Sequence, residues 1–101
     1  MPFEWDERKR ESNLLKHHID FEDAKRIFEG PVFEKAEQRR GENRVFAIGR
    51  FDDIDIVVVC VIRGVNRRII SARIAHRDER QEYQKHLAEA VSGENEPGSA
   101  A

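Results

Sequence analysis

The feature that most constrains the fold is a run of ten residues, 54–63, which reads Ile-Asp-Ile-Val-Val-Val-Cys-Val-Ile-Arg and is the most apolar segment of the chain. Its length and its β-branched composition predict a strand. Residues 64–66, Gly-Val-Asn, predict a short turn, and residues 68–74 form a second β-branched run. The two runs together predict the middle of an antiparallel sheet.

The second run carries arginine at places where a plain core strand would not. Successive side chains of a regular pleated strand point to opposite faces of the sheet. We therefore expect one face to carry Ile69, Ser71 and Arg73, and the other face to carry Arg68, Ile70, Ala72 and Ile74.

The rest of the chain predicts three helices and three further strands. Asp6 is placed to cap a helix over residues 7–17, and Asp20 to cap a second helix that ends at Gly30-Pro31. The second helix has an apolar stripe of Phe21, Ala24, Ile27 and Phe28. Strands are expected at 3–5, 32–37 and 44–51, with a polar loop at 38–43, a turn at Asp52-Asp53 and a last helix at 77–91. This order, β-α-α-β-β-β-β-α, predicts an α+β fold with helices packed on a central antiparallel sheet.

Length limits the chain to one domain. At 101 residues and 39% hydrophobic content, the chain can bury roughly 60 to 65% of its unfolded surface around one modest core. We assign residues 1–91 to this domain. Residues 92–101 are small and polar, with nothing to anchor them, and are expected to form a disordered tail.

Charge is spread unevenly along the chain, although the formal net charge is only −2. Residues 1–38 carry a net −3, residues 39–80 a net +4 and residues 81–101 a net −3. A basic middle with acidic ends is compatible with a polyanion site on the sheet. No apolar run approaches the roughly 18 residues of a membrane span, and no signal segment opens the chain, so we expect a cytoplasmic protein with no membrane contact.

Arginine on β-structure is the main chemical feature. Four arginines lie in or at the ends of predicted strands, where a guanidinium group is held more rigidly than on a helix surface: Arg50, Arg63, Arg68 and Arg73. Fixed guanidinium groups suit the oxygens of a phosphate. The alternative is that they decorate an exposed sheet face and pair with carboxylates such as Glu34, Asp52, Asp53 or Glu79.

Lys16 and His17 close the first predicted helix. A histidine near a helix C-terminus tends to keep its proton, and histidine is the side chain that titrates nearest neutrality. Ordinary helix capping is the simpler explanation of the same pair. The other histidines and Cys60 show no metal-ligand spacing, and no phosphate-binding loop appears, so we expect neither a metal nor a cofactor.

Metal-free cleavage of RNA needs three kinds of group. One takes the proton of the 2′-hydroxyl, one balances charge on the phosphate, and one protonates the departing 5′-oxygen. A histidine, a lysine, rigid arginines and a tyrosine supply these groups without a cofactor, and this chain has all of them.

Two separated blocks of the sequence carry a family pattern. The first comprises residues 3–7, Asn13, Lys16-His17, residues 19–24 and Phe28, and the second comprises Ile48-Gly49, residues 57–59, Arg63-Gly64, residues 68–73, Ala75, Glu79-Arg80 and Tyr83. In this order they resemble the BrnT toxins of bacterial type II toxin-antitoxin systems. The resemblance implies a RelE-like fold and a ribonuclease that arrests growth. It also implies a BrnA-like antitoxin with a ribbon-helix-helix part, through which alone the pair would contact operator DNA.

Three positions depart from the family pattern. His18 stands where glycine is usual, and histidine suits a left-handed helix cap less well, so the first helix could end differently. Threonine is usual at the positions of Val61 and His76, and at His76 it would complete a capping box with Glu79. These changes bear on local geometry rather than on the fold.

The resemblance and the chemistry together define a hypothetical site for an RNA substrate. The catalytic residues of this hypothesis are His17 as general base or acid, Lys16, Arg63 and Arg73. The RNA-binding residues are Arg68, Arg50, Arg80 and Tyr83. The alternative is a binding module without catalysis, either a degenerate toxin or a nucleic-acid-binding adaptor, whose sheet docks a partner protein.

Overall fold

The structure, a computed structural model, describes residues 2–94, with side chains to residue 90. In chain order its elements are β1 (Phe3–Glu4), α1 (Glu7–His17), α2 (Phe21–Ala24), the 3₁₀ helix η1 (Lys25–Glu29), β2 (Phe33–Arg39), β3 (Glu42–Phe51), β4 (Ile54–Arg63), β5 (Asn66–Ile74) and α3 (Arg77–Glu94). The predicted α+β class and the predicted order of strands and helices are confirmed, with η1 continuing α2 directly.

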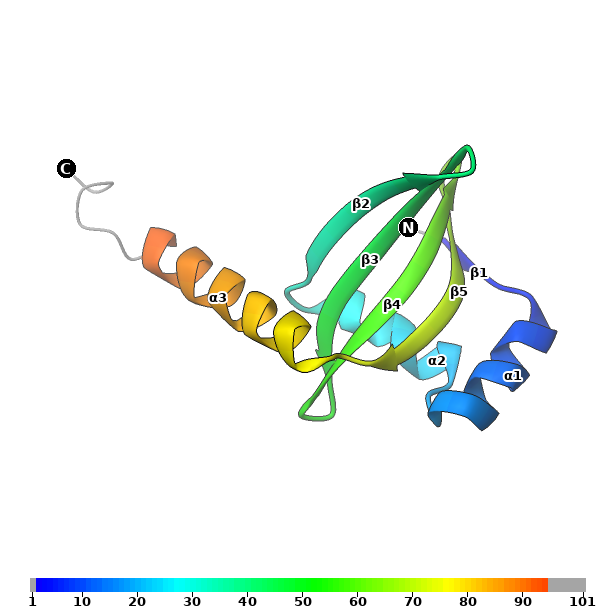
Figure 1. Cartoon of the computed structure of the whole chain (residues 1–101), viewed down its shortest axis with the longest axis horizontal. Helices are drawn as coiled ribbons and strands as arrows, with labels where there is room; N and C mark the ends of the chain where they lie inside the picture. Colours follow the sequence, from blue (N-terminus) through cyan, green and yellow to red (C-terminus); the bar gives the residue numbers. More distant parts are fainter. Residues whose placement is uncertain (1, 95–101) are drawn as a thin grey trace.

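The strands form one five-stranded sheet in the order β1-β5-β4-β3-β2 (Figure 1). β4, the apolar run, lies at its centre and pairs antiparallel with β3 on one side and β5 on the other, as predicted. Residues 55–61 of β4 are all buried. β1 adds to the β5 edge in parallel, a pairing that the sequence did not predict.

The two predicted aspartate caps are present. The Asp6 carboxylate accepts a hydrogen bond from the Arg8 amide at 2.8 Å, and the Asp20 carboxylate accepts one from the Glu22 amide at 3.0 Å. After one α-helical turn the second helix tightens into η1 and ends at residue 29. Its apolar stripe packs into the core through Phe21, Ala24 and Ile27, with Phe28 partly buried beside them.

His18 ends α1 in a left-handed conformation, with φ 60° and ψ 27°. Its amide donates to the carbonyl of Leu14 at 2.9 Å, which is the bond that a glycine cap would make. The helix therefore ends as it would with glycine, although a left-handed conformation costs a non-glycine residue roughly 1 to 2 kcal/mol.

Two predicted boundaries were wrong. Residues 38–43 were expected to form a loop, but β2 continues to Arg39 and β3 starts at Glu42, so that only Arg40 and Gly41 turn, both with positive φ. β2 is an edge strand with an almost fully exposed surface, and such a strand needs no apolar pattern. α3 continues through residues 92–94, which were assigned to the tail, and the rest of that predicted tail, 95–101, lies outside the described residues.

A β-bulge in β5 overturns the expected division of its side chains between the two faces. Val59 of β4 lies opposite Ser71. The next residue of β4, Cys60, lies opposite Ile69, which leaves Ile70 as an extra residue. An extra residue reverses the alternation of side chains beyond it.

The bulge places two buried residues on one side of the sheet and the arginines on the other. Ile69 and Ala72 are both fully buried in the same cluster. Arg73 lies opposite Val57, which belongs to the cluster on the other side. Arg68, Ser71 and Arg73 therefore share one face, where regular alternation had separated Arg68 from Arg73.

The helices leave the sheet with one covered face and one open face. α2 and η1 pack on the covered face, and Gly49 permits this because a Cβ there would lie only 2.7 Å from the Cβ of Ile27. On the open face α3 packs at one end through Tyr83, against Ile48 and Val57, and then runs away from the sheet (Figure 1). Much of the open face is therefore left without a helix.

Asn13 fastens α1 to the edge of β5. Its side-chain amide donates to the carbonyl of Ala72 at 2.9 Å, and its side-chain oxygen accepts from the Ala72 amide at 3.1 Å, as a neighbouring strand would. The amide also donates to the carbonyl of Ile19 at 3.0 Å. These bonds fix the position of Lys16 and His17, one turn further along α1.

We predict that Asn13→Ala lowers the free energy of unfolding by about 2 to 4 kcal/mol, because it leaves the Ala72 amide and two carbonyl groups without these partners. Urea denaturation followed by circular dichroism measures the change. Glu11→Ala, at an exposed position of the same helix, is the matched control and should change the stability by less than about 0.5 kcal/mol. Equal losses in the two variants would contradict the role of Asn13.

Candidate active site

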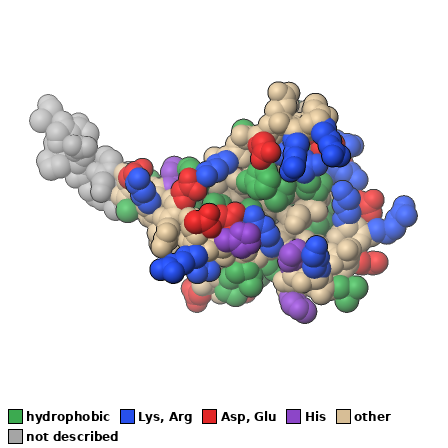
Figure 2. Space-filling model, in the orientation of Figure 1, with side chains coloured by type: hydrophobic (Ala, Val, Ile, Leu, Met, Phe, Trp, Pro, Cys, Tyr) green, Lys and Arg blue, Asp and Glu red, His purple; other side chains and the backbone are tan. Residues whose placement is uncertain are grey.

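The open face has an apolar floor with cationic side chains around it. The floor consists of Phe46, Val59, Val61 and Ile70, which are buried or half-buried. Strand register places four cationic side chains on the same face: Lys35, Arg44, Arg68 and Arg73. Figure 2 shows hydrophobic side chains at the centre of this face with lysine and arginine side chains near them. Such a surface suits a polyanion that also carries flat apolar groups.

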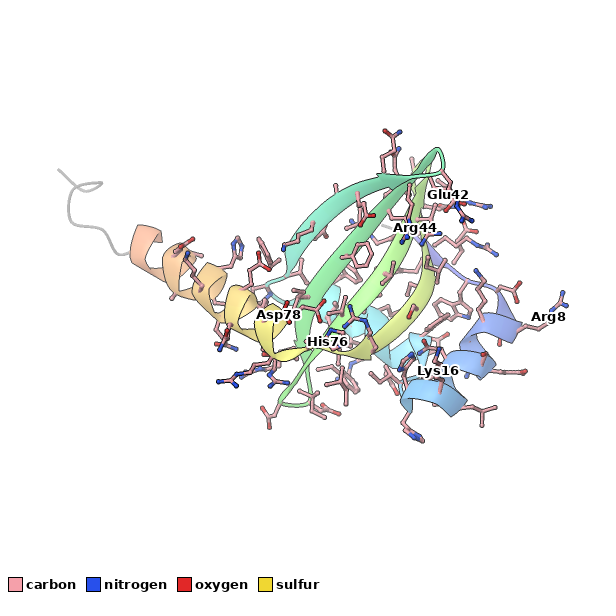
Figure 3. All side chains as sticks on the ribbon, viewed as in Figure 1. Arg8, Lys16, Glu42, Arg44, His76 and Asp78 are labelled. Carbon is pink, nitrogen blue, oxygen red and sulfur yellow. The ribbon has the colours of Figure 1, made fainter. Side chains whose placement is uncertain are left out.

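A cleft of about 230 Å³ lies between α1 and β5 at one side of the open face. α1 contributes Lys16 and His17, and β5 contributes Ile70 and Ser71. In Figure 3 Lys16 is labelled at the C-terminal end of α1. The cleft thus brings the predicted base and the predicted lysine together with a hydroxyl of the sheet.

His17 has a lowered pKa in this cleft. Burial lowers the pKa of its imidazole most, and the charges of Lys16, Arg73 and His18 lower it further. The helix C-terminus was expected to favour the protonated form, and this was wrong because burial and cationic neighbours outweigh the helix dipole. A neutral imidazole can accept a proton, as a general base must.

Arg73 is held in place by Glu79 of α3. Its two terminal nitrogens donate to the two Glu79 oxygens at 2.8 and 2.9 Å, and the pair holds the pKa of Glu79 at about 2. Glu79 also accepts the His76 amide at 2.7 Å, at the start of α3. The guanidinium is therefore fixed in direction, close enough to His17 for its charge to lower the pKa of the imidazole.

Arg68 and Arg63 lie further along the open face. Arg68 donates to Glu4 at 2.8 Å, and this bond is the largest cause of the lowered pKa of Glu4. Arg63 ends β4 opposite Asn66. A rise of about 3.3 Å per residue separates Asn66 from Ser71 by roughly 16 Å along β5. Arg63 is thus not part of the cleft.

The other three predicted RNA-binding residues do not line the cleft. Arg50 donates to the buried Asp55 at 3.1 Å, beside the turn between β3 and β4. Arg80 donates to a carbonyl at the end of β5 at 3.2 Å. Tyr83 is 1% exposed, and its hydroxyl donates to the carbonyl of Pro31 at 2.9 Å, so it packs α3 against the sheet.

Pairing with carboxylates, the alternative role of the strand arginines, is present for three of the four: Arg50, Arg68 and Arg73. Arg73 has the expected partner, Glu79, whereas the other two pair with acids that were not expected. Within residues 2–90, Arg63 forms no ion pair. Pairing directs a guanidinium group but reduces the net positive charge of the face.

The contributors to the open face that were not identified from the sequence include Ser71, Lys35, Arg44 and Phe46. Ser71 was expected on the same face as Ile69, because regular alternation was assumed, and alternation along the chain does not reveal a β-bulge. Lys35 and Phe46 are register partners on β2 and β3. The alternation of residues 44–51 could have placed Phe46 on one face, but it could not show which face the helices leave open.

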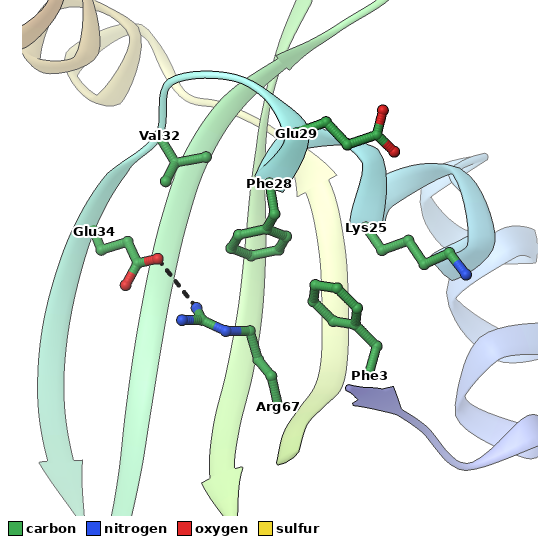
Figure 4. A pocket seen from close by; sticks show the side chains of 7 residues that line it. All are labelled: Phe3, Lys25, Phe28, Glu29, Val32, Glu34 and Arg67. Atoms are coloured by element: carbon green, nitrogen blue, oxygen red, sulfur yellow. Dashed lines mark hydrogen bonds and ion pairs between the residues drawn. The ribbon is translucent and has the colours of Figure 1, made fainter. Parts of the chain in front are cut away.

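A larger hollow, of about 550 Å³, lies on the covered face between β1, η1 and β2 (Figure 4). Arg67 donates to Glu34 across it at 3.1 Å, and its guanidinium lies 4.8 Å from the ring centroid of Phe28. The lining contains no histidine, the side chain that exchanges protons most readily near neutral pH. The chemistry of the candidate site therefore belongs to the open face.

The remaining candidate for covalent chemistry is Cys60, which is fully buried in β4. Burial raises the pKa of its thiol to about 11, so the thiol is protonated at neutral pH. Within residues 2–90, no three histidine, cysteine, aspartate or glutamate side chains gather as metal ligands would. In the same part of the chain, no helix has the length and apolar character needed to cross a membrane.

Comparison with known protein families identifies a match over most of the chain. A family model described as "Ribonuclease toxin, BrnT, of type II toxin-antitoxin system" matches residues 5–79. This range contains α1, four of the five strands and the start of α3, and so the whole cleft. No curated protein sequence matches the chain.

We predict that His17 titrates below the ordinary histidine pKa of about 6.5, and that Arg73→Gln raises this value, because one positive charge near the imidazole is removed. Nuclear magnetic resonance titration of the imidazole measures both. Arg50→Gln is the matched control and should leave the pKa of His17 unchanged, since Arg50 is not one of the groups whose charge lowers that pKa.

The lowered pKa of His17 also makes the stability of the fold depend on pH. Because folding lowers the pKa of His17, the unfolded chain binds the proton more tightly, and His17 reduces stability as the pH falls through the ordinary histidine pKa. A His17 that titrates at or above about 6.5 in the folded protein would show that the cleft does not favour the neutral imidazole.

Proposed function

The chain belongs to the BrnT family of ribonuclease toxins of type II toxin-antitoxin systems, and we propose that it is an endoribonuclease that cleaves RNA without a metal ion in the cleft between α1 and β5. One observation carries the proposal. A histidine with a lowered pKa shares the cleft with Lys16, and the charge of Arg73 reaches it.

The proposed reaction starts with a neutral His17, which takes the proton from a ribose 2′-hydroxyl. The 2′-oxygen attacks the adjacent phosphorus and the bond to the 5′-oxygen breaks, which leaves a 2′,3′-cyclic phosphate on one fragment. Lys16 balances the charge of a non-bridging oxygen and gives a proton to the departing 5′-oxygen. Arg73, directed by Glu79, stabilises the crowded phosphate.

The backbone of a single-stranded RNA would follow β5 from the cleft. Arg68 lies on the same face three residues from Ser71, and Arg63 lies beyond it. These side chains would hold phosphates on one side of the cleaved bond, and Arg44, on the same row as Arg68, would hold the strand over β3. Arg50, Arg80 and Tyr83 have no place in this path.

The partner in this proposal is a BrnA-like antitoxin with a ribbon-helix-helix part. The family description, which names a toxin-antitoxin system, supports a protein partner. An antitoxin segment with apolar side chains could cover the floor at Val59, Val61 and Ile70 and exclude RNA from the cleft. Operator DNA would be contacted only through the antitoxin, and the toxin would act on RNA in the cytoplasm.

A binding module without catalysis is the second candidate. The observation that favours it is the pairing of Arg50, Arg68 and Arg73 with carboxylates of the chain itself. A paired guanidinium attracts a polyanion less than a free one does. In this case the open face docks a protein, and His17 has no role in function.

We predict that the purified protein cleaves a single-stranded RNA of mixed sequence in the presence of EDTA and leaves 2′,3′-cyclic phosphate ends. His17→Ala should slow cleavage by about 10² to 10⁴, the range that a general base supplies. Arg73→Ala should slow it by about 10² to 10³, because a fixed donor to the phosphate is lost. Gel electrophoresis of end-labelled RNA measures the rates.

Arg26→Gln is the matched control for this experiment, since Arg26 lies over Phe51 on the covered face. Its rate should equal that of the wild type, and circular dichroism should show an intact fold in every variant. Cleavage that survives His17→Ala unchanged would exclude the proposed mechanism, and a wild type that cleaves nothing would favour the binding module.

We further predict that expression of the chain arrests growth of a bacterium and that a co-expressed BrnA-like antitoxin restores it. His17→Ala should abolish the arrest but keep the antitoxin bound, because the imidazole is a small part of the open face. Plate growth and calorimetric titration measure the two effects. Arrest that persists in His17→Ala would mean that toxicity comes from binding rather than cleavage.

A further inference from the structure

We propose that a hollow at the α3 end of the open face holds a guanine base of the RNA substrate. The hollow has a volume of about 330 Å³ and lies between β2, β3 and the first turns of α3. This assignment rests on the proposed function, since it names the base that is held beside the cleavage site. It adds a sequence preference to the reaction.

The apolar walls of this hollow are formed by Phe46 and Ile48 of β3. A nucleobase can stack on an exposed aromatic ring, and such stacking contributes substantially to the binding of single-stranded RNA. Phe46 of β3 lies opposite Val59 of β4, and Val59 lies opposite Ser71 of β5, which lines the catalytic cleft. Two strand spacings, roughly 10 Å, separate Phe46 from Ser71, so one nucleotide can reach both.

Glu79 connects the hollow with the catalytic groups. It lines the hollow, and its two oxygens hold Arg73 at 2.8 and 2.9 Å. The charge of Arg73 in turn acts on His17. If the phosphate of a nucleotide lies at Arg73, the base of the same nucleotide can therefore reach the hollow.

The charges of the hollow favour a base over a phosphate. Its lining includes three carboxylates, Glu37, Glu79 and Glu82, and one ammonium group, Lys35. Carboxylates repel a phosphate but accept hydrogen bonds from the N–H groups of a base. The backbone thus belongs to the cationic cleft, and the base belongs to the hollow.

The Lys35–Glu82 pair selects among the four bases. Lys35 Nζ lies 2.7 Å from one oxygen of Glu82, and both side chains are about half exposed, so they can turn into the hollow. The Lys35 ammonium offers a hydrogen-bond donor, and the two carboxylate oxygens of Glu82 offer two acceptors beside it. The Watson–Crick edge of guanine offers the complement, O6 as acceptor followed by N1–H and the N2 amine as donors, whereas adenine, cytosine and uracil do not.

Cleavage mapping tests the preference. On a single-stranded RNA of mixed sequence, the wild type should cut next to guanine at least about tenfold faster than next to the other bases, the loss expected when a charged hydrogen bond is missing. Glu82→Gln should remove this preference. Phe46→Leu should slow cleavage at guanine about tenfold, because the ring is lost. Phe46→Tyr keeps the ring and should cleave at guanine at the wild-type rate. Glu29→Gln, on the covered face, is the control and should cut like the wild type.

A binding experiment keeps this inference separate from the reaction. His17→Ala protein is titrated by fluorescence anisotropy with a short RNA that contains one guanosine, and with the same RNA containing inosine, which lacks the N2 amine. Guanosine should bind about tenfold more tightly, and Glu82→Gln should abolish the difference.

The two experiments fail in different ways. If the protein binds the guanosine RNA more tightly but cleaves no RNA, the proposed ribonuclease activity is wrong and the base site remains. Cleavage without base preference, together with equal binding of guanosine and inosine, would overturn the base site and leave the nuclease intact.

Discussion

One extra residue in β5, Ile70, decides which side chains reach the open face. Without it, Arg73 would share a side with Ile69, under α2, and the arginines of this strand would be divided between the two faces. With the bulge, Arg68, Ser71 and Arg73 all face the same way, and Ile70 joins the apolar floor. Bulges are frequent beside active sites because they redirect single side chains in this manner.

Two polar contacts then assemble the site from α1, β5 and the start of α3. Asn13 takes the place of a neighbouring strand at Ala72, so that the end of α1 stands beside β5. Glu79 joins α3 to the same strand by holding Arg73. Both contacts occur where the edge or the end of β5 would otherwise present unpaired groups, so they stabilise the fold and define the cleft at once.

The carboxylate partners of the arginines shape what the face can bind. Because Arg68 and Arg73 are paired, the face is only weakly positive, which agrees with a net charge of −2 for the chain. General attraction for polyanions is then modest. In the proposed function, selectivity would come from geometry instead of net charge, because the guanidinium of Arg73 is held in a fixed direction and the face also carries the imidazole of His17 and the ring of Phe46.

The sequence by itself determined the elements that depend on local rules: the aspartate caps at Asp6 and Asp20, the turn at Asp52-Asp53, the central apolar strand and the order of the fold. It also pointed to Lys16 and His17. Only the tertiary structure decided the bulge, the pKa of His17, and how far α3 covers the sheet. Local patterns report the neighbours of a residue along the chain, whereas burial, charge and strand register depend on residues that are far away in sequence and meet only on folding.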